Sequence, residues 1–266
     1  MRILSFDVGG SKISYGLVEE NGNIVGDIKV LPTPKTATEI LDIFKTAANE
    51  NKFDGLAVAT AGVVLNNKLA GKPNNLPKGY ENIDFAELSG TTYVVENDAN
   101  SAMWAEHEIG ALKGVQHGVM LTLGTDVGCG IICNGQILRG KCGAAGEVVF
   151  DCSGRSLQRL ASEAGSELTD CFAIYDLAIR QNGAERGAYK IWQENLLYCL
   201  RKINQILDTE IFVLSGSLAK IVDYAVINTS IKLLQPHNAP LIKPATCGTN
   251  SGLIGAALLC AGKMKG

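Results

Sequence analysis

The stretch from Ile3 to Val18 constrains the fold most, because a pair of glycines separates two runs of strand-like sequence. The first run carries Asp7 near its end, Gly9-Gly10 follows, and Lys12 to Val18 then alternates as a second strand. Because glycine has no side chain, its backbone N–H group can approach an anion closely. A carboxylate at the strand end would lie beside that anion. A plain hairpin turn has the same pattern, so the stretch alone leaves both interpretations open.

The pattern of this first stretch returns later in the chain. Residues 1 to 31 are predicted to form a three-stranded meander, because Glu20-Asn-Gly-Asn23 is a strong hairpin signal. The same order of strand, glycine turn, strand and Asn-Gly turn recurs over Gly118 to Leu138. Two such meanders, each followed by helices and further strands, predict a duplicated α/β protein of two lobes. One glycine turn from each lobe is expected to face the other.

Length and composition agree with two lobes and exclude several classes. A chain of 266 residues is long for one core, and we predict an N-terminal lobe over 1–113, joined by a C-terminal helix over 249–266, and a C-terminal lobe over 114–248. The net charge of -3 gives no indication of a nucleic-acid partner. No signal peptide or apolar run of spanning length is recognisable, so we expect a cytoplasmic protein without a membrane anchor. The eight cysteines include no Cys-x-x-Cys and are interpreted as buried free thiols.

Two predicted strands of the first lobe end in residues suited to a ligand. A helix is predicted over 37–50, with Thr38 as its N-cap, and the buried-type strand after it ends in Ala61-Gly62. Ligands of open α/β sheets bind at the carboxyl edge of the strands. The strand over 92–96 runs into Asn97-Asp98 and a helix over 101–112. There Asp98 could take a proton from a substrate hydroxyl, or Asn97 or Asp98 could simply cap the helix.

Other polar and glycine positions follow the same logic with weaker signals. Asn75 lies in a long loop over 65–90, where it is either functional or an ordinary turn residue. Glu147 looks like a buried acid after a run of glycine and alanine. Gly216 ends a strand beside a predicted helix N-terminus, which suits a nucleotide or another anion. Further helices are predicted over 157–164, 169–182, 184–207 and 251–262, and a last strand over 240–242.

Taken together, six motifs resemble the ROK family of bacterial sugar kinases and repressors, which belongs to the actin-like ATPase superfamily. They follow in the expected order over nearly the whole chain: Asp7-Val-Gly-Gly-Ser-Lys12, Glu96-Asn-Asp-Ala-Asn100, Leu123-Gly-Thr-Asp-Val-Gly128, Gly143-Ala-Ala-Gly-Glu147, Leu214-Ser-Gly-Ser217 and Gly252-Leu-Ile-Gly-Ala-Ala257. The resemblance implies a two-lobed, ribonuclease H-like α/β fold with a duplicated mixed-sheet core and a central cleft.

The resemblance also implies roles for individual residues. ATP phosphates would lie near Gly9, Gly10, Ser11, Lys12, Gly124 and Thr125, with the adenosine near Gly216. Mg²⁺ would lie near Asp7, through water. Asp98 would be the catalytic base toward a sugar hydroxyl, and the sugar-binding residues would be Gly62, Asn75, Asn97, Asp98, Glu147 and Gln158. Catalysis of this kind depends on positioning and charge stabilisation.

Several positions depart from the family pattern. Phe150 stands where the family usually has a His, and Gln158 stands where a Glu touches the sugar. The zinc signature is reduced to Cys152 and Ser153-Gly-Arg-Ser156, so no structural zinc is expected. Asp126 replaces a common glycine and adds a negative charge near the expected phosphates.

Within the family, four segments look most like the N-acetylmannosamine kinase branch: Leu31-Pro-Thr-Pro34, Ala59-Thr-Ala-Gly-Val-Val64, Asn74-Asn-Leu76 and Met103-Trp-Ala-Glu106. The sequence therefore predicts an ATP-dependent kinase that phosphorylates the 6-hydroxyl of N-acetylmannosamine, and a homodimer. A glucokinase-type enzyme and a sugar sensor with weak catalysis are the alternatives. A repressor is disfavoured, because no helix-turn-helix precedes the strand at Ile3.

Overall fold

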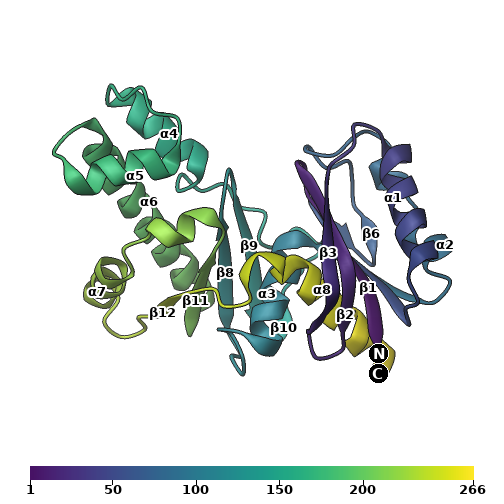
Figure 1. The fold of residues 1–266 in the computed structure, drawn as a ribbon. Coiled ribbons are helices and arrows are strands. Elements are labelled where there is room, and N and C mark those ends of the chain that lie inside the picture. Colours follow the sequence, from purple (N-terminus) through teal and green to yellow (C-terminus); the bar gives the residue numbers. More distant parts are fainter. The chain divides into compact units, whose positions relative to one another are not determined.

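A computed structural model describes residues 1–266, and the chain forms two compact units (Figure 1). The first unit contains Met1–Gly114, Ile137–Ala145 and Thr246–Gly266, and the second contains Val115–Gln136 and Gly146–Ala245. Residues Ile137–Ala145 thus lie in the first unit, although they fall inside the range 114–248 that the sequence analysis gave to the C-terminal lobe. No helix has the length and apolar character needed to cross a membrane.

The first unit is built on a five-stranded mixed sheet with the order β3-β2-β1-β4-β7. Its strands β1, β2 and β3 form an antiparallel meander, as the hairpin signals predicted, and β1, β4 and β7 are parallel. Val8, Thr60 and Asn97 lie in register, so three parallel strands end at one edge. The strands are β1 (Arg2–Val8), β2 (Lys12–Glu19), β3 (Ile24–Pro32), β4 (Gly55–Thr60) and β7 (Thr92–Asn97).

Helices cover both faces of this sheet. The elements outside the sheet are α1 (Ala37–Glu50), β5 (Val64–Leu65), β6 (Lys68–Leu69), η1 (Tyr80–Asn82), α2 (Phe85–Ser89), α3 (Asp98–Ile109), η3 (Gly248–Asn250) and α8 (Ser251–Lys265). On one face, Phe6 of the sheet packs in a cluster with Phe44 of α1 and Phe85 of α2. On the other face, buried side chains of α8 pack against β1 and β4. Figure 1 shows α1 and α8 beside this sheet.

The predicted cap of α1 was wrong by two residues. Thr36, not Thr38, is the N-cap, and it forms a capping box with Glu39. The spacing Thr-x-x-Glu satisfies two backbone donors reciprocally, and this signal outweighs the position of Thr38 one residue inside the helix.

Helices α3 and α8 cross at very close range. A Cβ added to Gly255 would lie 1.7 Å from the backbone oxygen of Ser101, so only glycine permits this approach. The buried carboxylate of Glu106 on α3 accepts hydrogen bonds from the backbone N–H groups of Thr246, Cys247 and Ala111 at 2.6–2.7 Å. These bonds fix the segment that leads into α8, which completes the first unit.

The second unit repeats the sheet of the first. Its strand order is β10-β9-β8-β11-β12, with β8 and β9 antiparallel and β8, β11 and β12 parallel. Because the order and directions match β3-β2-β1-β4-β7, the predicted duplication is confirmed. The strands are β8 (Gly118–Leu123), β9 (Val127–Cys133), β10 (Gln136–Ile137), β11 (Ile211–Ser215) and β12 (Leu241–Pro244). Ile137, the last residue of β10, begins the segment that belongs to the first unit.

The helices of the second unit pack around a core centred on Trp192, whose indole N–H donates to the Ser153 oxygen at 3.0 Å. The buried face of α6 runs through Trp192, Leu196 and Leu200, and Ile191 next to it is 45% exposed. The elements are α4 (Gly154–Glu163), α5 (Cys171–Arg180), α6 (Ala184–Leu207), η2 (Ser217–Ile221) and α7 (Tyr224–Leu234), and α7 was not predicted.

Candidate active site

The turn between β1 and β2 is held by backbone hydrogen bonds and by close packing. The Gly9 N–H donates to the Lys12 oxygen at 3.0 Å, and the Thr33 hydroxyl donates to the Gly9 oxygen at 2.6 Å. A Cβ added to Gly10 would lie 2.7 Å from the Cβ of Asn75. The structure therefore brings Asn75, from the long loop, directly against the predicted phosphate turn.

Asp7 lies on β1 just before this turn, in a poorly solvated position. Burial raises the pKa of its carboxyl from the ordinary value of 3.8 to about 6, while the positive charge of Lys12 offsets part of the increase. A Cβ added to Gly252, in the first turn of α8, would lie 2.8 Å from the Asp7 Oδ2 atom. The carboxyl has no hydrogen-bond partner in the protein, so its charge is available to a cation or its hydration shell.

Asn97 organises the start of α3 at the edge where β7 ends. Its Oδ1 atom accepts from the backbone N–H groups of Ala99 and Asn100 at 2.9 and 3.1 Å, and its amide donates to the Gly62 oxygen at 3.0 Å. Gly62 has a φ of +101°, which favours glycine. The cap of α3 is therefore Asn97, and the helix does not depend on Asp98 for that purpose.

Asp98 is the first residue of α3 and is partly buried. Its Oδ1 atom accepts from the Ala99 N–H at 2.8 Å. A carboxylate at the carboxyl edge of three parallel strands is suited to act as a general base.

Glu96 lies near the end of β7 and belongs to the same motif as Asp98, but the sequence predicted no role for it. It is 3% exposed, and its Oε2 atom accepts from Arg139 Nε and Nη2 at 2.9 and 2.6 Å. Its Oε1 atom accepts from the side chain of Asn100 and the N–H of Asn97 at 3.1 and 2.9 Å. A buried carboxylate needs such partners. The only sequence signal for Glu96 was its position two residues before Asp98, and no sequence signal pointed to Arg139.

In the second unit, the turn between β8 and β9 is joined to the start of α4. The Gly154 N–H donates to the Gly124 oxygen at 2.7 Å, and the Arg155 N–H donates to the Thr125 oxygen at 3.3 Å. Gly216 follows β11 with a φ of +84°, and a Cβ there would lie 2.4 Å from the Leu123 oxygen. The predicted nucleotide residues Gly124, Thr125 and Gly216 are thus brought together around one strand end.

A pocket of about 180 Å³ opens beside this turn within the second unit. Gly124, Thr125, Arg155, Gln158 and Ser217 are among the residues that line it. Gln158 was predicted to touch sugar, and here its amide donates to the Thr169 oxygen at 2.5 Å. The side chain of Gln158 therefore has a structural partner within its own unit.

Two expectations were wrong in whole or in part. Glu147 was predicted to be a buried acid but is exposed, whereas Gly146 before it packs against the backbone of β9. The cysteines are all free thiols, but they are not all buried as predicted, since Cys142 is exposed and Cys133 and Cys247 are only partly buried. Phe150 packs against the core of the second unit, and Cys152 lies beside Cys199 with 3.9 Å between the two sulfurs.

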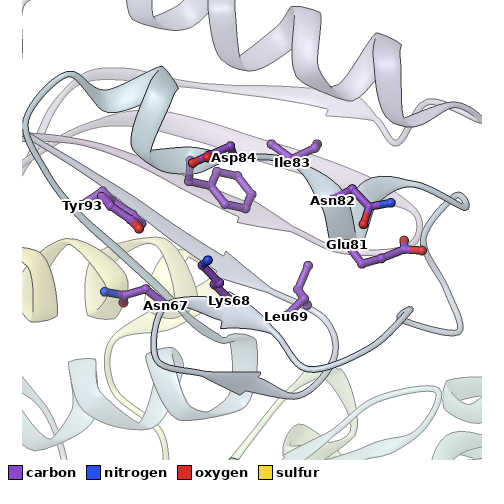
Figure 2. A pocket seen from close by; sticks show the side chains of 9 residues that line it. Asn67, Lys68, Leu69, Glu81, Asn82, Ile83, Asp84 and Tyr93 are labelled. Carbon is purple, nitrogen blue, oxygen red and sulfur yellow. The ribbon is translucent and has the colours of Figure 1, made fainter.

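A separate pocket of about 240 Å³ lies in the first unit between the β5–β6 hairpin and the η1–α2 segment (Figure 2). Lys68 and Leu69 form one side, Asn82, Ile83 and Asp84 the other, and Tyr93 lies at one end. None of the predicted site residues lines it. Each unit therefore has its own set of candidate site residues, and both sets lie at strand ends.

Comparisons with known proteins define the class first. A ROK glucokinase from Streptomyces griseus, solved with glucose and AMPPNP, covers the whole chain with a TM-score of 0.80 at 24% identity. A putative N-acetylmannosamine kinase from Listeria monocytogenes also covers the whole chain, with a TM-score of 0.89 at 22% identity. The duplicated mixed sheets and these likenesses confirm the predicted fold, which the chain shares with both solved structures.

The family follows from the sequence itself, because the ROK family profile matches residues 3–148. The chain belongs to the ROK family. N-acetylmannosamine kinase from Salmonella typhi is 27% identical over 98% of this chain and 99% of its own length. Glucokinase from Streptomyces coelicolor is 36% identical, but the match spans 54% of this chain and only 47% of the glucokinase.

Proposed function

We propose that the protein is an ATP-dependent sugar kinase that transfers the γ-phosphate to the 6-hydroxyl of a hexose or N-acetylhexosamine, with N-acetylmannosamine as the preferred substrate. The observation that carries the proposal is the arrangement of Asp98. The carboxylate lies in the first turn of α3, Asn97 caps the helix, and Arg139 pairs with the buried Glu96 near the end of β7.

Asp98 is the base in the proposed reaction. Its carboxylate takes the proton of the sugar hydroxyl as that oxygen attacks the γ-phosphorus. The bond from the γ-phosphorus to the bridging oxygen breaks, and ADP leaves with the electron pair. Because little covalent chemistry falls to the protein, orientation of the hydroxyl by Asp98 is the main contribution of this residue.

The turns of the two units are proposed to bind the nucleotide. In the first unit, the candidate contacts are Gly9, Gly10, Ser11 and Lys12. In the second unit, Gly124 and Thr125 receive phosphates, and the pocket next to Ser217, one residue after Gly216, receives the remainder of the nucleotide. Gly62, Asn75, Asn97, Glu147 and Gln158 are the proposed sugar contacts. The exposed acid Glu147 has the polarity for hydroxyl recognition.

Mg²⁺ fits the chemistry at Asp7. The Asp7 carboxyl is partly buried, has no hydrogen-bond partner and has a raised pKa, and a cation beside it would favour the charged form. Magnesium retains several waters and binds through one or two carboxylates plus phosphate oxygens. When bound, the ion would neutralise charge that develops on the phosphates.

The choice of sugar rests on the relatives. Similarity to N-acetylmannosamine kinases extends over nearly the full length of both chains, which favours N-acetylmannosamine. Glucose is the second candidate, because identity to the glucokinase is higher within the matched half. A sugar sensor with weak catalysis is the third candidate. The added negative charge of Asp126 is a weaker argument for it, because Arg155 pairs with Asp126 at 2.7 Å and compensates that charge.

A coupled ADP-release assay over hexoses and N-acetylhexosamines tests the function. We expect N-acetylmannosamine to give the highest kcat/KM, and Asp98→Asn to lower kcat by about 10²-fold or more, because the general base is lost. Asp84→Asn is the matched control, since Asp84 caps α2 and asparagine caps equally well.

Retention of full turnover in Asp98→Asn would contradict the assigned base. If no sugar supported turnover but one raised the melting temperature, the sensor would be the correct function. Glucose as the best substrate would transfer the assignment to a glucokinase.

The proposal includes a homodimer in the cytoplasm. Ile191 and Tyr198 of α6 are 45% and 58% exposed, and we propose that these side chains contribute to the surface between the two copies. Light scattering coupled to size-exclusion chromatography would give twice the chain mass of 28.2 kDa, and a monomer at assay concentration would contradict the dimer.

A further inference from the structure

We propose that Arg155 binds a phosphate of the donor nucleotide, and that Asp126 holds its guanidinium beside the phosphate turn when no nucleotide is bound. This inference rests on the proposed function and adds a donor-recognition residue to it. It concerns two positions where this chain departs from its family pattern, the acid in the turn and the remnant of the zinc motif.

The backbone places Arg155 at the turn. The N–H groups of Gly154 and Arg155 donate to the oxygens of Gly124 and Thr125, at 2.7 and 3.3 Å. These two bonds connect the start of α4 to the turn between β8 and β9. Arg155 also lines the 180 Å³ pocket with Gly124, Thr125 and Ser217. The arginine therefore lies in the wall of the pocket proposed for the nucleotide, next to the turn proposed for its phosphates.

Charge explains why an arginine is needed at this position. Asp126 adds a carboxylate to a turn that would approach a polyanionic nucleotide, and like charges repel at short range. The Arg155 Nη1 atom donates to the Asp126 Oδ1 atom at 2.7 Å and neutralises that charge. Of the other charged groups nearby, Asp170 caps α5, and Arg159 pairs with Asp151 and Glu163. Arg155 is therefore the cation that faces the turn.

The pair can exchange partners at low cost. The side chains of Arg155 and Asp126 are 64% and 57% exposed, and exposed ion pairs contribute little to stability. A phosphate carries more charge than a carboxylate and can accept two parallel hydrogen bonds from a guanidinium. With nucleotide present, Arg155 donates to phosphate, while its backbone bonds to the turn stay in place.

Calorimetric titration of the full chain with Mg·ADP and Mg·ATP, together with KM for ATP, tests this role. Arg155→Ala should weaken nucleotide binding and raise KM by about tenfold, the size of one charge-assisted hydrogen bond. Arg155→Lys should recover part of the affinity, because lysine keeps the charge but not the planar fork. Arg159→Ala, one turn further along α4, is the matched control and should bind as the wild type does.

The double variant Arg155→Ala/Asp126→Gly separates two roles. If Arg155 binds phosphate, removing Asp126 as well leaves affinity below that of Asp126→Gly alone. Equal affinity of the double and Asp126→Gly variants would mean that Arg155 only screens Asp126, and would overturn the inference. Thermal melting checks that each variant folds.

Unchanged affinity of Arg155→Ala in a protein whose wild type binds nucleotide would overturn this inference alone. Failure of the wild type to bind ADP or ATP would overturn both the inference and the kinase assignment.

Discussion

The β1–β2 turn and the β8–β9 turn occupy the same place in two sheets of the same strand order. The acidic residues at these two turns differ in burial and in ion pairing. In the first unit, Asp7 lies inside β1 with a pKa raised to about 6, and Asn75 packs on Gly10. In the second unit, Asp126 is 57% exposed and pairs with Arg155, and nothing crowds Gly124.

The difference shows that duplication of a topology preserves the path of the backbone but not its electrostatics. The Asp7 carboxylate at the first turn has no hydrogen-bond partner in the protein. Its charge can stabilise a bound cation, but it lowers the stability of the folded protein when no cation is bound. The second turn cancels its extra charge with an arginine of its own unit. The first turn is thus the one whose stability should depend on pH.

The largest expected effect is on Asp7. The folded protein holds the Asp7 proton more tightly than the unfolded chain, so the contribution of Asp7 to stability falls as pH rises from about 4 through 6. We expect Asp7→Asn to stabilise the protein without ligand by about 2 kcal/mol above pH 7. A shift of this size corresponds to ~3 kcal/mol, and partial exposure of the residue reduces it. Below pH 4 the gain should vanish, and kinase activity should be lost throughout.

Urea unfolding of wild type and Asp7→Asn across pH 4 to 8 measures this effect. Asp126→Asn is the matched control from the other turn. A pH-independent difference between wild type and Asp7→Asn would contradict the assigned burial of the charge. Mg·ATP should narrow the difference, because it would stabilise the ionised Asp7 of the wild type.

A smaller effect is expected when each turn receives one methyl group. Gly10→Ala places its Cβ 2.7 Å from the Cβ of Asn75, which forces the long loop to move and should cost about 1 kcal/mol. Gly124→Ala meets only the Asp126 oxygen at 3.8 Å, and its effect should stay within about 0.5 kcal/mol. Chemical denaturation compares the two, and equal costs would remove the packing difference between the turns.

The turn geometry and the duplication were predictable because they depend on local signals. Gly9-Gly10 and Asn134-Gly135 are turn signals that need no distant partner. The alternating strands on either side of each turn then specify its sheet. Asp98 was predictable for a similar reason, since a strand followed directly by Asn-Asp and a helix places the acid at a sheet edge.

Long-range pairs were not predictable. Arg139 lies 43 residues from Glu96, and no sequence pattern relates them before the chain folds. The pairing of Asp126 with Arg155, 29 residues away, was not predicted for the same reason. From the sequence alone, Asp126 was therefore an uncompensated negative charge near the expected phosphates. Helix α7 was missed because Ile227 and Ile231 are its only buried side chains, too few for a clear period.

The smallest expected effect tests whether the second turn is electrostatically neutral in the folded protein. Because the Asp126–Arg155 pair is exposed on both sides, Asp126→Asn should change the free energy of unfolding by no more than about 0.5 kcal/mol. At ~1 M salt, where the screening length is about 3 Å, even that difference should disappear. Denaturant unfolding at low and high salt measures it. A loss of several kcal/mol that persisted in high salt would mean that the pair holds α4 on the turn. In that case the two turns would differ in which side chain fastens them rather than in whether their charge is satisfied.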